Sequence, residues 1–528
     1  MSTIALATVA SCLLLTGCAG NPSNDSGGTG DPASTALGAV GITGDQPAAG
    51  DPQEGGTLVF ASYAPVASLD PTKTQPGGSA GGTEMAAIYD LLVRYDASTQ
   101  TYEPQLAKSL TESDDHLSWT LKLRDGVTFN DGTALNAQAV VASTNRFNQK
   151  RGANSELFLQ SVKSVEATDD STVVYMMNQP WSEFPSLLNQ GHGMVVGTAS
   201  DLDGKFTPIG AGAFTLARLT GTELELNARP EYWNGKPHLD AVKFVDIKDD
   251  QPKIDALKSG GVHMAYLRNP TTVSSAKSDF PGYFETVSMM DVGQINNREG
   301  RPGSDVRVRK AMALAIDPEV INQRVMGGLG MPGTEIFQPW STWHSDVKGL
   351  TPNLDEAKKL TDEAKADGFD GKITYVAVQS PASQAMALTA QSMLQAAGFD
   401  VEIVYTASAT DMIKRIYVDH DFDLSSGAFS IADAAPYVRL YSTMHSGSSN
   451  NIAGLDDPEI DSILADIQTA TTTDAKRSKI ADLQKAVDQK APFMAWGAGA
   501  SFVPWTSNVY GVVPSMTSIM LLDQTWIN

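Results

Sequence analysis

Cysteine is almost absent from this sequence. Cys12 and Cys18 are the only two cysteines in 528 residues, and both lie within the first twenty. No disulfide can therefore form within the chain that follows Cys18. If the protein is exported, a hydrophobic core must hold its fold, and a chain of this length can build one.

Basic residues are also scarce. The chain has 38 Lys and Arg against 61 Asp and Glu, a net charge of −23 at pH 7, and its first basic residue is Lys73. An acidic surface keeps a protein soluble and disfavours nucleic acid and anionic lipid as partners. Acidity also suits cationic ligands, although solvated surface carboxylates explain most of the excess.

Long hydrophobic runs are missing after the N-terminal region. Ile4–Leu15 is the one extended apolar run, and it is too short to cross a bilayer, which needs about 20 residues. Its length fits the apolar part of a secretory signal. The following "LTGC" resembles the bacterial lipobox, in which cleavage leaves a lipidated cysteine as the new N-terminus. We therefore expect a signal peptide over residues 1–17 and lipidation of Cys18; the alternative is a chance cysteine within a signal peptide.

Residues 19–56 contain no aromatic side chain and are rich in Gly, Ala, Ser, Pro, Asn and Asp. Such a composition cannot bury enough apolar area to order itself. We expect a flexible tether over residues 18–51 and a folded body from residue 52. The body opens with "GGTLVFAS", a strand-like run.

The body divides into a β-rich half and a half in which helices and strands alternate. "SWTLKLRDGVTFNDGT" alternates Trp119, Leu121 and Leu123 on one face and contains Asp-Gly turns, which is typical of hairpins. From about residue 300 the apolar period predicts helices, one capped by Asp305 and another starting at Asp355. "KITYVAV", "QAMALTAQSMLQAAG" and "FDVEIVYT" predict strand, helix and strand of a parallel sheet.

Enzyme motifs are present only in incomplete form. "GGSAG" would make Ser79 the nucleophile of a surface hydrolase, but no buried strand leads into it. "GLGMPG" follows a predicted helix instead of a strand, and no phosphate-binding G-x-x-x-x-G-K-[ST] occurs. The seven histidines show no metal-ligand spacing. We expect no catalytic activity, no cofactor and no metal.

The ordered phrases of the body resemble one family. "GGTLVFA…SLDPTK", "LSWTLKLRDGVTFNDGTALNAQAVVAS", "LNARPEYWNGKPHLDAVKF" and "SDVRVRKAMALAIDPEVI" are similar, in this order, to family 5 extracytoplasmic solute-binding proteins. Members of that family serve ABC importers of oligopeptides, dipeptides and nickel. The resemblance covers nearly the whole chain after the tether.

The resemblance implies an α/β fold of the type II periplasmic-binding-protein class, with two lobes, two hinge crossings and an extra β-rich subdomain. Lobe I would comprise residues 52–290 and 500–528, with the subdomain near 76–205. Lobe II would comprise residues 293–498. The hydrophobic period changes from strand-like to helical near residue 300, and no linker separates the two parts. Both observations fit lobes that are interleaved along the chain.

The implied function is that of a lipid-anchored, monomeric binding protein outside the cell membrane. It would capture a peptide in the cleft between the lobes and deliver it to the permease and ATPase of an ABC importer. The alternative within the family is a non-peptide solute, such as a nickel chelate or a sugar. A peptide-binding sensor or adhesin without transport is a third reading.

The resemblance also implies ligand contacts. Asp433 matches the aspartate that pairs with a peptide's ammonium group, and Ser430 and Ile431 match positions that offer backbone hydrogen bonds. The spacing from Asp433 to Pro436 is one residue shorter than in peptide binders. The alternative is that Asp433 only caps a helix starting at Ala434.

Other positions bear on the kind of ligand and on the walls of the cleft. Ser380 stands where dipeptide binders carry an arginine that clamps the ligand carboxylate, which argues against a strict dipeptide site. Trp496 and the segment from Tyr63 to Val66 could wall the cleft, or could be ordinary core.

Overall fold

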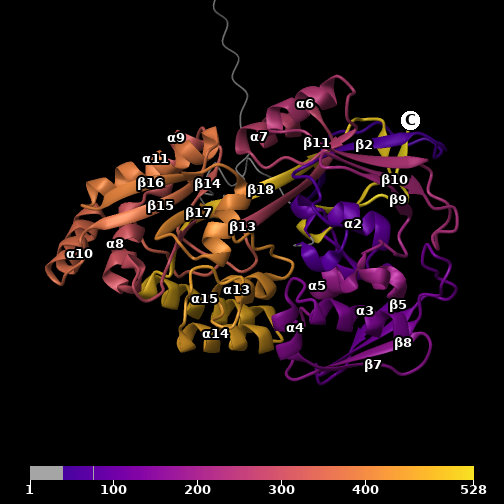
Figure 1. The fold of residues 1–528 in the computed structure, drawn as a ribbon, viewed down its shortest axis with the longest axis horizontal. Helices are drawn as coiled ribbons and strands as arrows, with labels where there is room; N and C mark the ends of the chain where they lie inside the picture. Colours follow the sequence, from indigo (N-terminus) through magenta and orange to yellow (C-terminus); the bar gives the residue numbers. More distant parts are fainter. Residues whose placement is uncertain (1–39, 75–76) are drawn as a thin grey trace, which may run out of the picture.

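Two long neighbouring strands join the halves of the molecule. The computed structural model describes residues 40–74 and 77–528. Strands β13 (Gly282–Ile295) and β18 (Phe493–Pro504) pair antiparallel and run through the centre of the molecule (Figure 1). Their register is interrupted between Val287 and Val292, where Met289 has a φ of 53°. Each strand thus contributes one part to each half, which confirms the two-lobed fold with two crossings.

The first half is built on a five-stranded sheet in the order β12-β2-β11-β10-β9. Leu58 and Phe60 of β2 are buried in its core, as their alternation predicts. The chain returns to this core after β18, where Met520 is fully buried. The elements are β2 (Thr57–Ser62), β9 (Phe214–Leu219), β10 (Glu223–Ala228), β11 (Ala241–Asp246), β12 (Met264–Ala265), α2 (Gly82–Tyr89), α6 (Asp250–Lys258) and α7 (Pro270–Asp279).

A separate four-stranded sheet, in the order β5-β6-β8-β7, forms the β-rich subdomain of this half. Trp119, Leu121 and Leu123 lie on one face of β6 and are buried, which confirms the predicted hairpin pattern. The elements are β3 (Val93–Asp96), β4 (Thr101–Pro104), β5 (Ala107–Glu112), β6 (Ser118–Leu123), β7 (Val162–Ala167), β8 (Thr172–Met177), α3 (Ala137–Gln149), α4 (Ser155–Ser161) and α5 (Pro185–Leu188).

The second half contains the predicted parallel unit, in which β15 and β16 pair side by side. Asp305 caps α8 by accepting a hydrogen bond from the Arg307 N–H. Helix α10 begins at Leu354, one residue before the expected start at Asp355, and Asn353 is its N-cap. The elements are β14 (Met331–Pro332), β15 (Lys372–Val378), β16 (Asp400–Thr406), β17 (Leu424–Gly427), α8 (Val306–Ala315), α9 (Pro318–Val325), α10 (Leu354–Ala366) and α11 (Pro381–Ala396).

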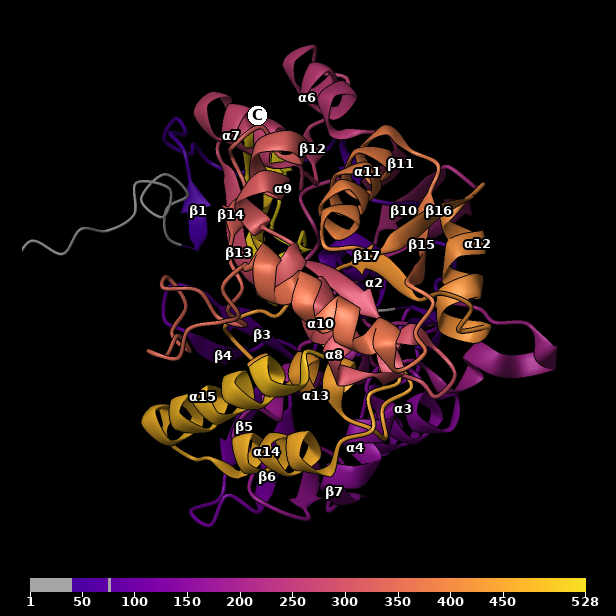
Figure 2. The same ribbon diagram turned by 90° about the vertical axis from the view of Figure 1, so that its left-hand side faces the viewer.

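Three further helices of this half contact the β-rich subdomain. They are α13 (Pro436–Met444), α14 (Pro458–Thr469) and α15 (Thr473–Lys490), and they lie below the sheet of the second half (Figure 2). The ring of Tyr437 packs edge-on against Trp181, with centroids 6.0 Å apart. Gln468 donates a hydrogen bond of 2.7 Å to the Ser161 hydroxyl. The halves therefore touch at the crossing strands and again along this surface.

Part of the segment expected to be a flexible tether forms a strand. Residues Gly41–Thr43 form strand β1, which pairs antiparallel with β13 from Gly41 opposite Phe284 to Thr43 opposite Gly282. An unpaired strand edge offers backbone donors and acceptors to a segment of any composition, so burial of apolar side chains is not required. This part of the 18–51 prediction is wrong.

The predicted signal peptide over residues 1–17 and the lipidated Cys18 lie outside the described residues and stay predictions. Within residues 40–74 and 77–528, no helix has the length and apolar character needed to cross a membrane.

Candidate functional site

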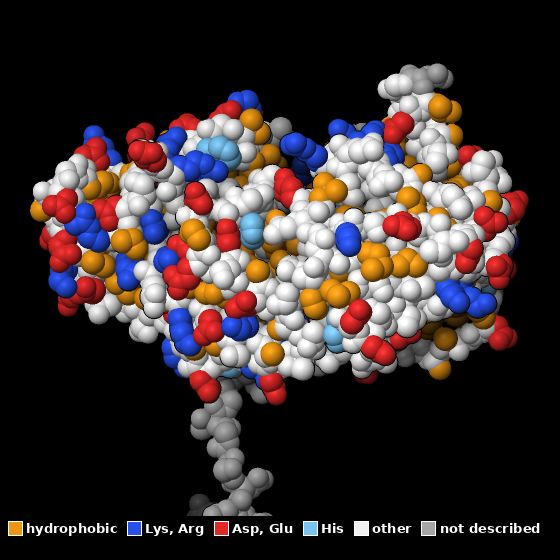
Figure 3. Space-filling model, turned by 90° about the horizontal axis from the view of Figure 1, so that it is seen from below, with side chains coloured by type: hydrophobic (Ala, Val, Ile, Leu, Met, Phe, Trp, Pro, Cys, Tyr) orange, Lys and Arg blue, Asp and Glu red, His pale blue; other side chains and the backbone are white. Residues whose placement is uncertain are grey.

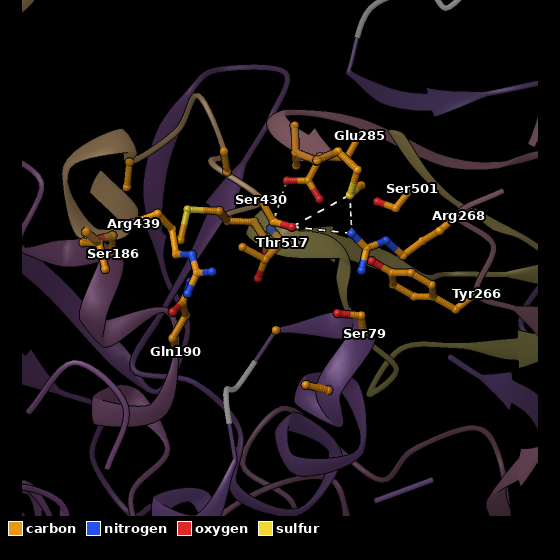
Figure 4. A pocket seen from close by; sticks show the side chains of 18 residues that line it. Ser79, Ser186, Gln190, Tyr266, Arg268, Glu285, Ser430, Arg439, Ser501 and Thr517 are labelled. Atoms are coloured by element: carbon orange, nitrogen blue, oxygen red, sulfur yellow. Dashed lines mark hydrogen bonds between the residues drawn. The ribbon is translucent and has the colours of Figure 1, made fainter. Parts of the chain in front are cut away.

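A cavity of about 190 Å³ lies between the two halves, beside the crossing strands. Ser79, Gln190 and Arg268 of the first half and Ser430 and Arg439 of the second half line it (Figure 4). Because both halves supply polar side chains, a solute held here would contact both of them.

Ser79 brings the G-x-S-x-G stretch to this cavity. It lies in a short 3-10 helix, Gly78–Ala80, capped by Gly77. A nucleophilic serine needs a tight turn between a strand and a helix, which this segment does not provide in its described part. Ser79 therefore contributes a hydroxyl group to the wall of a binding cavity.

Glu285 on β13 is the buried acid of this wall. Its carboxylate accepts hydrogen bonds from the Thr517 N–H at 3.0 Å and the Ser518 hydroxyl at 2.7 Å. Burial raises the pKa of Glu285 to about 7, against the effect of those hydrogen bonds. Glu285 forms no ion pair with any described Lys or Arg. The protonated form of Glu285 therefore persists closer to neutral pH than that of an ordinary glutamate.

Arg268 lies at one end of the cavity. Its guanidinium donates to the Ser430 hydroxyl at 3.4 Å and contacts the Met290 sulfur. It also lies over the ring of Tyr63, 5.3 Å from the centroid. Tyr63, one of the predicted wall residues, is half-exposed and therefore holds Arg268 from outside the cavity.

Arg439 lies at the other end, on α13. Its Nε donates to the Phe429 carbonyl at 2.8 Å. Burial lowers the pKa of Arg439, an effect that neighbouring Tyr417 opposes. Figure 4 shows its guanidinium extending into the cavity beside Gln190.

The segment before α13 brings Ser430 and Ile431 to the crossing strands. Ser430 has a φ of 52°, which is uncommon for a residue other than glycine and is found at functional sites. Its hydroxyl faces the cavity (Figure 4). Ile431 is fully buried, and its N–H donates to the Ser288 carbonyl while its own carbonyl accepts from the Ser288 N–H, both at 2.9 Å. The backbone groups that Ile431 was expected to offer a ligand are thus already bonded to Ser288.

Asp433 lines a second cavity of about 500 Å³, and Glu285 lines both cavities. The Asp433 carboxylate accepts hydrogen bonds from the Ser341 hydroxyl at 2.7 Å and the Thr342 N–H at 2.8 Å. Burial raises the pKa of Asp433, and these bonds only partly offset it. The structure thus separates Asp433 from the cavity that Ser430 lines.

The alternative role of Asp433 as a helix cap is wrong. Helix α13 begins at Pro436 and its N-cap is Ala435. The one-residue shortening before Pro436 leaves Asp433 in the loop, so its carboxylate bonds the segment around Ser341 instead.

The other predicted wall residues lie apart from this cavity. Trp496 is 2% exposed and packs in the core of the second half. Val66 packs against the core of the first half and lines a narrow gap near Glu84. Ser380 caps α11 by accepting a hydrogen bond from the Ser383 N–H at 3.3 Å. Ligand contact by Trp496 and Val66 stays a prediction.

The three charged residues that line the cavity, Glu285, Arg268 and Arg439, were missed from the sequence. Two of them had a visible signal. Arg439 is the lone charge in "AAPYVRLY", and Glu285 is the lone charge in "GYFETVSMM". A single charged residue within an apolar run indicates a buried polar role, since lone buried charges are costly. Arg268, in the loop "YLRNP", offered no such contrast.

Charged groups elsewhere are spread over the surface. Figure 3 shows acidic and basic side chains interspersed over the face seen from below. Among the described residues, no group of three or more His, Cys, Asp or Glu side chains is placed to hold a metal ion.

Comparisons with known proteins agree with this architecture. The family model described as bacterial extracellular solute-binding proteins, family 5 Middle, matches residues 101–451. The dipeptide-binding protein of Escherichia coli K12 is 26% identical over 359 residues, which cover 62% of this chain and 66% of that protein.

Two solved structures share the fold. DppA of Helicobacter pylori, an ABC transporter-associated periplasmic binding protein solved with the peptide STSA, superposes with a TM-score of 0.76 at 22% identity, covering 90% of this chain and 98% of that one. AgaA from A. tumefaciens R10, solved with agropinic acid, gives a TM-score of 0.75 at 24% identity and covers 90% and 99%.

Proposed function

Because the chain belongs to the bacterial extracellular solute-binding proteins of family 5, we propose that it captures a peptide in the cavity between its halves and delivers it to an ABC importer. The family consists of solute-binding proteins and not of enzymes, so no bond-making chemistry is required. The partners would be the permease and ATPase subunits, and the working unit would be a monomer.

The observation that supports this proposal most strongly is that residues of both halves line the cavity. Arg268 comes from the first half, Arg439 comes from the second, and β13 and β18 connect the two. A solute that binds both halves favours the closed state in proportion to its differential affinity, which is how binding becomes a signal to a transporter. Exclusion of water from the closed cavity strengthens each polar contact.

The direct test is to identify the solute and measure closure. Native mass spectrometry of the gently purified protein would reveal a co-purifying ligand, and calorimetry would give its affinity. Small-angle scattering with and without that ligand should show a decrease in radius of gyration. Heat of binding without any change in scattering would contradict the closure part of the proposal.

A non-peptide solute is the second candidate. Ser380 caps α11 and supplies no positive charge at the position where dipeptide binders carry an arginine. AgaA shows that the same fold is found with a non-peptide acid bound. The mass of the co-purifying ligand separates the two candidates.

Membrane attachment through Cys18 is the remaining part of the proposal, and it is supported by the apolar run Ile4–Leu15 and the "LTGC" stretch. Replacement of Cys18 by serine should release the protein from the membrane fraction and abolish metabolic labelling with radioactive palmitate. A membrane-bound Cys18→Ser protein would contradict lipid anchoring without affecting the proposal about solute capture.

A further inference from the structure

The cavity contains two guanidinium groups without a protein counter-ion. Neither Arg268 nor Arg439 forms an ion pair with any Asp or Glu in the described residues. Acidic residues exceed basic ones by 61 to 38 in this chain, so carboxylates are plentiful. Arg146 illustrates the usual arrangement, since it binds Asp70 at 2.8 Å and Asp201 at 2.6 Å.

Arg439 is the less satisfied of the two. One hydrogen bond, from Nε to the Phe429 carbonyl, is made by its guanidinium within the described chain. Arg229 is more deeply buried and also lacks a carboxylate partner, but its Nη2 donates to three oxygens of Thr128 and Phe129. Arg439 is half-buried, and a charge that is partly removed from solvent without such partners is costly. The four remaining N–H groups of Arg439 are thus available to a ligand.

Gln190 lies beside Arg439 but belongs to the other half of the molecule. Its side chain lies next to the Arg439 guanidinium, at the same end of the cavity (Figure 4). An amide N–H next to a guanidinium fork forms a set of donors that matches the two oxygens of a carboxylate. A carboxylate bound by both side chains would connect the halves directly.

Two acidic side chains lie near this positive charge, but neither forms an ion pair with Arg268 or Arg439. Burial raises the pKa of Glu285 to about 7. Asp291 interacts with Arg268 through space without forming an ion pair, and burial raises the pKa of Asp291 to about 6. The two guanidinium groups therefore lie near carboxyl groups to which neither is ion-paired within the described residues.

We propose that this cavity selects solutes of net negative charge, with an acidic group of the solute bound between Arg439 and Gln190. Carboxylates fit best, because a guanidinium binds their two oxygens through parallel hydrogen bonds. The inference rests on the proposed solute-binding function and narrows it to acidic peptides or other acidic small molecules.

The experiment is calorimetric titration of the dialysed protein with matched probes. The peptide probes are Ala-Glu-Ala, Ala-Ala-Ala and Ala-Lys-Ala, and the non-peptide probes are glutarate and its neutral diamide. We expect an acidic probe to bind about tenfold or more tightly than its neutral counterpart, which corresponds to one charge-assisted contact.

Variants assign the preference to Arg439. Arg439→Gln should lose at least about tenfold in affinity for the acidic probe, and its loss for the acidic probe should exceed its loss for the neutral counterpart. Arg439→Lys, which keeps the charge, should retain part of the preference. Arg324→Gln, at an exposed position of α9, is the matched control and should bind like the wild type. Melting curves would verify that each variant is folded.

Each outcome decides one proposal or both. Equal binding of acidic and neutral tripeptides overturns the charge selectivity and leaves peptide capture standing. Binding of glutarate without any tripeptide supports the selectivity and removes peptides as the solute. An acidic preference that survives in Arg439→Gln overturns the assigned residue, and no binding of any probe counts against both proposals.

Discussion

Lys476 of α15 and Glu183 of the β-rich subdomain form a buried ion pair across the two halves of the molecule. The side chains are 5% and 8% exposed, and the second oxygen of Glu183 accepts a hydrogen bond from the Tyr437 N–H at 3.0 Å. Because both charges are removed from solvent, the contact between the halves is stable only while Lys476 and Glu183 remain paired.

Removal of Lys476 should therefore destabilise the protein. Lys476→Met leaves Glu183 buried without its partner, and we expect a loss of about 3–5 kcal/mol in the free energy of unfolding. Urea denaturation followed by tryptophan fluorescence would measure it. Lys485→Met, in the exposed pair with Asp482, should cost less than about 1 kcal/mol. Similar losses in both variants would show that the buried pair has no special role.

Glu285 should make stability depend on pH. Its carboxyl ionises near the ordinary value of 4.5 in the unfolded chain and near 7 in the folded protein. The folded state therefore binds more protons across this range, and stability falls as the pH rises from 4.5 to 7. The loss from this group is on the order of 3 kcal/mol.

Glu285→Gln should flatten that decline in a series of urea denaturations between about pH 4 and pH 8. Glu84 and Asp90, whose pKa values burial also raises to about 7, keep part of the slope in the variant. The exposed Glu231 provides the control, since Glu231→Gln should leave the slope unchanged. An identical slope in Glu285→Gln and wild type would refute the assignment.

Asp433→Asn tests the predicted ammonium anchor. If the second cavity receives a peptide's N-terminus, the variant should bind peptides about 2–5 kcal/mol more weakly, because a buried charge pair is lost. Acetylated peptides should not distinguish the variant from the wild type. Asp474→Asn, at a side chain 93% exposed, is the matched control. Unchanged calorimetric affinity for free peptides would remove Asp433 from the site.

Trp496 should act through stability and not through binding. A Cβ added to Gly293 would lie 2.5 Å from Cζ2 of Trp496, so the indole is tightly enclosed. Trp496→Phe should lower the free energy of unfolding by about 1–3 kcal/mol through imperfect filling of this space. Ligand affinity at a temperature where the variant stays folded should match the wild type. Weaker binding without loss of stability would place Trp496 in the site.

Local features of the fold were predictable from the sequence. The Asp305 cap and the strands on either side of α11 depend on neighbouring residues, so composition and period were sufficient. Strand β1 was not predictable, because its partner Phe284 lies about 240 residues away and a run of three residues, Gly41–Thr43, is too short to indicate a strand by itself.

The site was harder to predict than the fold. The resemblance to the family predicted that Ser430 and Asp433 contact the same ligand, whereas in the structure they line two different cavities. The left-handed backbone at Ser430 and the shortened approach to Pro436 decide where each side chain points. Such turns depend on contacts from distant segments, here Met289 and Ser341, which no local pattern contains.

The pairing of β1 with β13 has a mechanical consequence. Gly41 is joined to Phe284, a few residues from the point where the register of the crossing strands is interrupted. Displacements during a hinge motion are smallest close to its axis. A membrane attachment upstream of Gly41 would therefore hold the molecule near the hinge axis. Both halves could then move about the hinge with little displacement of the attachment point.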